Sequence, residues 1–189
     1  MADQGTEGLL SPWLRRRRIA AALPHLRGNV LDVGCGSGAL AEQVPAKRYT
    51  GVDIDRDSLA IANATYPEHE FRDALPGSDT SFDTIVSLAV IEHVPDPAGF
   101  LTSLAKRLGA GPDCRIVITT PRPSVDWIHT AGAAIGLFSG HANEEHEELL
   151  DRPELEQVAH DSGLELETYD RFLFGANQLA IFRRRGAIE

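Results

Sequence analysis

The sequence has few cysteines, no excess of basic residues and no long apolar run, and each absence excludes a class of protein. Only two of the 189 residues are cysteines, Cys35 and Cys114, which excludes a disulfide framework and does not match the spacing of a zinc site. The net charge of −10 leaves no basic excess to displace counter-ions, so we expect no nucleic-acid partner. No apolar run is long enough to cross a bilayer, and we expect no membrane partner.

An arginine run at 15–18 precedes a short apolar run at 19–23. Pro24 ends the apolar run too early for a secretory signal, so we expect a cytoplasmic protein with both cysteines as small buried thiols. The arginines have two interpretations. We favour a solvated helix face; the alternative is that one arginine leans over a cofactor pocket toward a carboxylate or a substrate phosphate.

The composition is that of an ordinary soluble domain, with 42% hydrophobic and 24% charged residues. Strand and helix patterns alternate along most of the chain, and we predict one domain over residues 1–189, monomeric or homodimeric. Residues 1–27 form an N-terminal helical segment in this prediction. Residues 121–150 interrupt the alternation and are predicted to form a lid over the substrate.

A glycine-rich turn follows the buried strand predicted at 30–33. Gly34, Gly36 and Gly38 occupy alternate positions, and a short helix is predicted from Ala39 to Val44. Glycines let a ligand approach the backbone, and the amides at the helix start would face a polar or anionic group. Because Gly34-x-Gly36-x-x-Ala39 also satisfies the relaxed dinucleotide pattern, a nicotinamide or flavin cofactor stays open here.

Acidic residues recur where the next strands end. Asp53 lies at the end of the strand predicted at 49–55, and Asp73 ends a third at 71–74. The position of Asp53 is typical of a ribose-binding acid. Asp32 lies inside the first strand, where an ionised carboxylate is costly without a partner. A fourth strand at 82–88 leads into Ile91-Glu92-His93-Val94.

This ordered series of motifs strongly resembles the class I S-adenosylmethionine-dependent methyltransferases, with the likeness covering about residues 28–185. It is most similar to the small single-domain members (type 11/23-like) that act on small molecules. The resemblance implies an α/β, doubly wound, mostly parallel seven-stranded Rossmann-like sheet whose last strand is antiparallel. The chain itself agrees, because residues 171–177 are too few for a helical crossover between the last two strands.

The resemblance also implies the cofactor and its binding residues. The cofactor is S-adenosyl-L-methionine, with S-adenosyl-L-homocysteine as product, and no metal is expected. The glycine turn holds the methionine portion, Asp53 the ribose, Asp73 with Ala74 the adenine, and Ile54 stacks on the base. Asp32 lies near the amino group or organises the turn. The implied set is Asp32, Gly34, Cys35, Gly36, Asp53, Ile54, Asp73, Ala74, Ser87 and Leu88.

A base is needed only if the acceptor must lose a proton. The candidates are His93, His141 and His146. Two of them have a simpler interpretation: a packing residue for His93 and a solvated loop residue for His141. By the resemblance, His146 falls where many members of the group carry a histidine. His141, Glu145 and His146 form an alternative metal set, although glutamates in a run are more often solvated charge. We predict methyl transfer to a small-molecule oxygen or nitrogen. The alternatives are a non-catalytic cofactor-binding regulator or, less favoured, an NAD(P)-dependent oxidoreductase.

Overall fold

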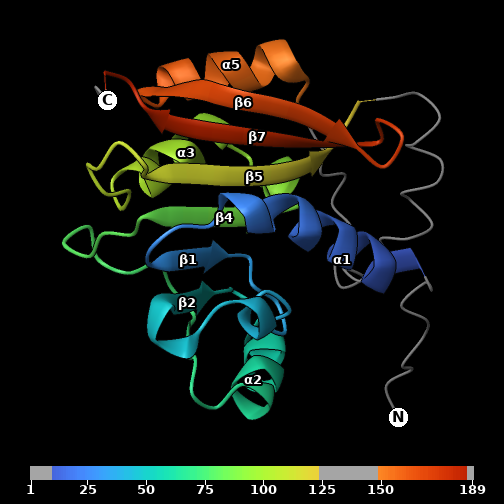
Figure 1. The fold of residues 1–189 in the computed structure, drawn as a ribbon, viewed down its shortest axis with the longest axis vertical. Coiled ribbons are helices and arrows are strands. Elements are labelled where there is room, and N and C mark those ends of the chain that lie inside the picture. The colour runs from blue at the N-terminus through green and yellow to red at the C-terminus, as the bar shows by residue number, and fades with distance from the viewer. Residues whose placement is uncertain (1–9, 124–148, 187–189) are drawn as a thin grey trace.

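A seven-stranded sheet organises the computed structural model, which describes residues 10–123 and 149–186. The strands lie in the order β3-β2-β1-β4-β5-β7-β6 (Figure 1). Their bounds are β1 Val30–Val33, β2 Tyr49–Val52, β3 Glu70–Arg72, β4 Thr84–Leu88, β5 Arg115–Pro121, β6 Leu164–Phe172 and β7 Asn177–Arg184.

The strand directions confirm the predicted fold class. Strands β1 to β5 pair in parallel, whereas β7 is antiparallel to both β5 and β6. The order reverses between β1 and β4, whose carboxyl ends point to the right in Figure 1. Open α/β sheets bind their ligands outside the carboxyl ends of the strands at such a reversal. The topology therefore places the candidate site beside the glycine turn that follows β1.

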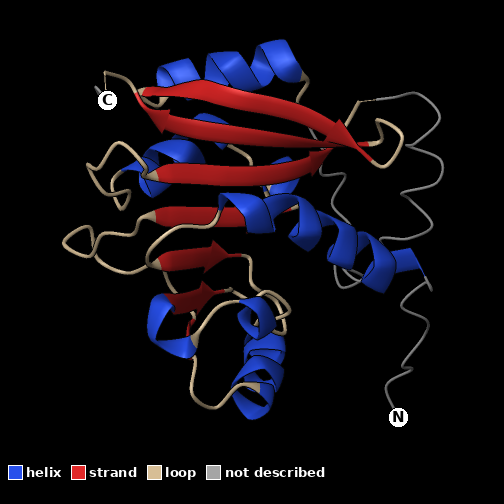
Figure 2. Ribbon diagram, in the orientation of Figure 1, coloured by secondary structure: helices blue, strands red, loops and turns tan. Residues whose placement is uncertain are grey.

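In the described part of the chain, four α-helices cover the sheet (Figure 2), and local sequence explains where three of them begin. Asp55 caps α2 and Asp96 caps α3, each accepting a backbone N–H of the first turn. Asp151 and Glu154 form the predicted capping box of α5. Their bounds are α1 Leu10–Ala22, α2 Arg56–Thr65, α3 Pro97–Ala105 and α5 Arg152–Asp161.

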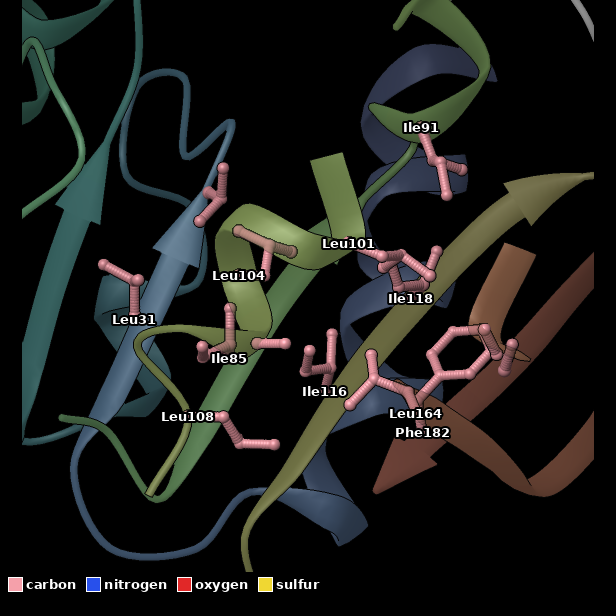
Figure 3. Close-up of a cluster of buried hydrophobic side chains, with 14 of the residues drawn as sticks. Leu31, Ile85, Ile91, Leu101, Leu104, Leu108, Ile116, Ile118, Leu164 and Phe182 are labelled. Carbon is pink, nitrogen blue, oxygen red and sulfur yellow. The ribbon is translucent and has the colours of Figure 1, made fainter. Parts of the chain in front are cut away.

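Two apolar clusters form the core, one on each face of the sheet. Alternate residues of a strand point to opposite faces, so Ile116 and Ile118 of β5 join one cluster and Val117 joins the other. The first cluster includes Leu101 and Leu104 of α3, packed over the strands (Figure 3). The second includes Ile19 and other residues of α1. Among the described residues, no helix is long and apolar enough to span a membrane.

One predicted element and several boundaries were wrong. Residues Ala39–Val44 do not form an α-helix; only a 3-10 turn, η2, forms at Ala41–Gln43. Gly38, with φ of +82°, and Pro45 leave too few residues for helical hydrogen bonds between them. The second strand stops at Val52, so Asp53 lies in the loop after it.

Candidate active site

The glycine turn contains three residues in left-handed conformations, Gly34, Gly36 and Gly38. Gly34 has φ of +79°, and a Cβ there would lie 2.3 Å from Cγ2 of Val90. Gly36 has φ of +51°, and a Cβ there would meet nothing within 4 Å. Glycine at 34 is thus required by packing, whereas glycine at 36 leaves open space directly above the backbone. That space is where a ligand can approach the main chain.

Four amides of this turn donate hydrogen bonds inside the protein. Gly34 and Cys35 both donate to the carbonyl oxygen of Val52, at 2.8 and 3.1 Å. Gly36 donates to Oδ2 of Asp53 at 2.7 Å, and Gly38 donates to the carbonyl oxygen of Cys35. These N–H groups already have acceptors, and the carboxylate of Asp53 lies beside the turn. Electrostatics therefore favour a cationic group here over an anionic one.

Asp53 is held in place by backbone groups on both sides of it. Besides the bond from Gly36, its Oδ1 accepts the amide of Asp55 at 2.9 Å. Each carboxylate oxygen keeps a second lone pair for a ligand hydroxyl. Ile54, the next residue, is 91% exposed, which is unusual for an isoleucine beside a buried strand. The pair thus offers a hydroxyl acceptor and an apolar surface side by side.

Asp32 lies behind the turn in β1 and is only 3% exposed. It accepts a hydrogen bond from the Tyr49 hydroxyl at 2.7 Å. Burial raises the pKa of Asp32 to about 7, the Tyr49 bond opposes the rise and the nearby charge of Asp53 adds to it. Burial also raises the pKa of the Cys35 thiol, which disfavours the reactive thiolate form.

The predicted adenine residues lie after β3, at the edge of the sheet. Asp73 is exposed and pairs with Arg56 of α2 at 3.0 Å. Because both side chains are largely exposed, this pair is weak and leaves Asp73 available to a ligand. Asp73 and the exposed Ala74 border an open hollow that also touches Arg56, Leu59 and Gly77.

The end of β4 contributes Ser87 and Leu88 to the same edge. Ser87 is fully buried and Leu88 is half-buried. Three buried polar atoms lack a hydrogen-bond partner within the described part of the chain: the hydroxyls of Ser87 and Thr119, and Nδ2 of Asn177. Thr119 lies in β5 beside Leu88, and Asn177 starts β7 beside Pro121. All three therefore lie toward the edge of the sheet that bears the glycine turn.

Glu92 is a candidate that sequence reasoning missed. It lies in η4, the 3-10 turn Ile91–His93 after β4, is 5% exposed and accepts a hydrogen bond from the Thr120 hydroxyl at 3.0 Å. Burial raises its pKa, while its backbone hydrogen bond and the charges of His93 and Arg18 oppose the rise. The sequence signal that could have indicated Glu92 was an acid shortly after a buried strand. Its buried partner, Thr120, is distant in sequence.

The arginine run divides between the two interpretations. Arg16 and Arg17 are exposed, as the favoured interpretation expects. Arg18 is half-buried, donates from Nε to Oδ1 of Asn177 at 3.0 Å, and interacts electrostatically with Glu92. Arg18 therefore does not lie on the solvated helix face. It lies with the polar groups at the carboxyl ends of β4 and β5.

Of the three histidine candidates, the structure locates one. His93 is exposed in η4, immediately after buried Glu92. His141 and His146, with most of the predicted lid at 121–150, lie outside the described residues. The structure thus gathers His93 and the ten predicted cofactor residues along the carboxyl ends of β3, β2, β1 and β4.

These residues suit the adenosyl cofactor on three counts. Open space lies above Gly36, Asp53 has free lone pairs, and Ile54 presents an exposed apolar side chain next to them. The buried hydroxyl of Ser87 adds an unpaired polar atom nearby. A ribose, an adenine and an amino-acid tail need this combination of an acidic hydroxyl acceptor, an apolar surface and close backbone approach.

The comparison with known proteins also indicates a methyltransferase. A family model described as a methyltransferase domain matches residues 8–169. A probable S-adenosylmethionine-dependent methyltransferase of Mycolicibacterium smegmatis is 29% identical over 183 residues, covering 92% of this chain and 67% of that protein. A ubiquinone biosynthesis O-methyltransferase of Paracidovorax citrulli is 36% identical over 110 residues, covering 52% of this chain and 46% of that protein. The chain thus matches less than half the length of the second relative.

Solved structures show the same fold. Magnesium protoporphyrin IX methyltransferase from Synechocystis, crystallised with bound S-adenosylhomocysteine, superposes with a TM-score of 0.70 at 16% identity, covering 96% of this chain and 90% of that one. The PH0226 protein from Pyrococcus horikoshii gives a TM-score of 0.69 at 17% identity, with 93% and 94% covered. From the family match and the shared fold, we conclude that this chain belongs to the class I S-adenosylmethionine-dependent methyltransferases.

Proposed function

We propose that the protein transfers the methyl group of S-adenosylmethionine to an oxygen or nitrogen of a small organic acceptor, with a hydroxyl as the preferred target. The relative from Paracidovorax citrulli is named as an O-methyltransferase, which supports oxygen as the acceptor atom. The observation that carries the proposal is the position of His93, an exposed imidazole at the carboxyl end of β4. A hydroxyl must lose its proton during methylation, and histidine is suited to accept it near neutral pH.

The cofactor supplies a methyl group on a sulfonium, which is already a good leaving group. The protein has to hold the donor, align the acceptor and exclude water. In this proposal Gly34, Cys35 and Gly36 surround the amino-acid end, Asp53 accepts the ribose hydroxyls and Ile54 covers the adenine. Asp73, Ala74, Ser87 and Leu88 complete the cofactor site, with Asp32 behind it.

In this proposal the acceptor lies near polar groups of β5, β7 and η4. The unpaired hydroxyl of Thr119 and Nδ2 of Asn177 suit an acceptor that carries oxygen atoms. Glu92 lies directly before His93 in η4, and the two side chains interact electrostatically. In this proposal His93 takes the proton from the acceptor hydroxyl.

Incorporation of a labelled methyl group tests the proposal. The protein is incubated with methyl-labelled S-adenosylmethionine and a panel of phenols, alcohols, amines and carboxylic acids. We expect label in a phenol or alcohol, at a rate that His93→Gln lowers without weakening S-adenosylhomocysteine binding. Binding of the cofactor with no transfer to any acceptor class would support the non-catalytic regulator instead.

A further inference from the structure

Arg18 is a half-buried cation whose hydrogen-bond partner in the described part of the chain is a neutral amide. It lies in α1, which packs across β4 and β5 (Figure 1), and its Nε donates to Oδ1 of Asn177 at 3.0 Å. Its neighbours Arg16 and Arg17 are exposed. A guanidinium that leaves water loses hydration, and one neutral amide replaces only part of it. The surroundings of Arg18 therefore suit a guanidinium that meets an anion.

The anion that Arg18 meets does not come from the described residues. None of their ion pairs includes Arg18. Glu92 interacts with it electrostatically, but the carboxylate of Glu92 accepts the Thr120 hydroxyl. Because Asn177 accepts from Nε, the two terminal nitrogens Nη1 and Nη2 stay available to a ligand. Two parallel donors in one plane match the two oxygens of a carboxylate.

Two buried polar groups beside Arg18 are also unpaired among the described residues. They are Nδ2 of Asn177 and the hydroxyl of Thr119. Thr119 lies on the same face of β5 as Val117. Asn177 lies on the same face of β7 as Leu179, and both apolar residues belong to the core cluster that α1 joins. Arg18, Asn177 and Thr119 thus form an arginine cluster with more donors than acceptors, which favours an oxyanion.

The loop after β4 connects the arginine cluster to the glycine turn. On one side Val90 packs against Gly34, where an added Cβ would lie 2.3 Å from Cγ2 of Val90. On the other side the amide of Ala89 donates to the carbonyl oxygen of Thr119 at 2.7 Å. Leu88, assigned above to the cofactor, is the register partner of Thr119. The cofactor site and the arginine cluster therefore lie on two sides of one short loop.

We propose that Arg18 binds a carboxylate of the methyl acceptor and that Asn177 positions the guanidinium. The inference rests on the function proposed above and narrows the acceptor to a hydroxy acid. Its carboxylate binds Nη1 and Nη2 of Arg18, and its hydroxyl faces the methyl group. The S–CH3 bond breaks as the O–CH3 bond forms, and the hydroxyl proton passes to His93.

Matched acceptor pairs test the inference on the unaltered protein. Each pair consists of a hydroxy acid and its own amide, such as para-hydroxybenzoate with para-hydroxybenzamide, and the panel adds hydroxycinnamic and aliphatic hydroxy acids. The labelled-methyl assay gives kcat/KM for each member. Where a pair is methylated, we expect the acid to exceed the amide by about 10- to 100-fold, because only the acid makes charge-assisted hydrogen bonds to Arg18.

Arg18→Gln should remove this preference. The KM of the acid should rise by about 10- to 100-fold, while the KM of the amide, kcat and the Kd of S-adenosylhomocysteine should stay within about twofold. Arg17→Gln is the matched control, since it removes the same charge from the exposed helix face and should keep the preference. Asn177→Asp places a carboxylate against Nε, and it should raise the KM of the acid alone by repulsion.

The outcomes separate the inference from the proposed function. Equal kcat/KM for acid and amide in the wild type, or an acid preference that a folded Arg18→Gln variant retains, overturns the inference and leaves the methyltransferase function in place. An equal loss of S-adenosylhomocysteine affinity in Arg18→Gln would assign Arg18 to the cofactor and also overturn it. Label in no acid or amide, with S-adenosylhomocysteine bound, overturns the proposed function and the inference with it.

Discussion

Asp53 and Asp55 are two acids in one loop, and the structure gives them different tasks. Asp53 accepts the amides of Gly36 and Asp55, at 2.7 and 2.9 Å, next to the glycine that has open space above it. Asp55 instead caps α2, accepting the amide of Asp57 and the hydroxyl of Ser58. Substitution of each acid by alanine should therefore affect different properties of the protein.

Asp53→Ala should weaken S-adenosylhomocysteine binding. A hydrogen bond to a charged group contributes about 1.5–3 kcal/mol, which corresponds to a Kd roughly 10- to 150-fold higher. The bond removed is the one from the ribose to the carboxylate. Calorimetric titration of the purified variant gives the Kd, and thermal unfolding shows whether the fold is retained.

Asp55→Ala is the matched control. Loss of a helix cap costs about 1 kcal/mol, and for a domain of this size that lowers the Tm by about 2–4 °C. Its affinity for S-adenosylhomocysteine should stay within about twofold of the wild type, well under 1 kcal/mol. If Asp55→Ala loses affinity and Asp53→Ala keeps it, the assignment of the ribose to Asp53 is refuted.

Three further substitutions test other parts of the site. The folded protein holds the Asp32 proton up to about pH 7 instead of 3.8, so its stability falls as pH rises between these values, by about 4 kcal/mol at most. Asp32→Asn should remove this fall, which urea unfolding at pH 4 and pH 8 measures; an equal fall in both proteins would contradict it. Gly36→Ala should weaken S-adenosylhomocysteine binding by roughly tenfold or more in calorimetry, whereas Gly163→Ala, at a similar positive φ in open space, should lose stability alone. His93→Gln should lower kcat by about 10²–10⁴ in the labelled-methyl assay with little change in Kd; an equal loss of both would indicate a structural role.

Local sequence predicted the elements whose causes are local. The capping box of α5 depends on Asp151 and Glu154, three residues apart, and was confirmed. The hairpin of β6 and β7 followed from the short connection between two strand patterns. The helix predicted at Ala39–Val44 failed because its apolar residues lie between Gly38 and Pro45, where only a 3-10 turn fits.

Only those residues of the candidate site that belong to a sequence motif could be predicted. Gly36 and Asp53 follow strands β1 and β2, so topology alone brings them to one edge. The contacts of Asp32 with Tyr49 and of Glu92 with Thr120 depend on strand register and side-chain packing across many residues. No local pattern encodes such contacts, which is why Glu92 was missed.

The partners of the turn amides depend on residues outside the glycine motif. A glycine turn before a helix is a general anion site. Here Val52 and Asp53 accept the amides of Gly34, Cys35 and Gly36, and the helix is absent. Three of the amides in this pattern are therefore used within the protein.

A crystal structure with S-adenosylhomocysteine tests the central claim most directly. We predict the ribose hydroxyls on the Asp53 carboxylate, the adenine against Ile54 and the amino-acid end at the open space above Gly36. Density for the nucleoside away from the Asp53 carboxylate, with the space above Gly36 empty, would contradict it.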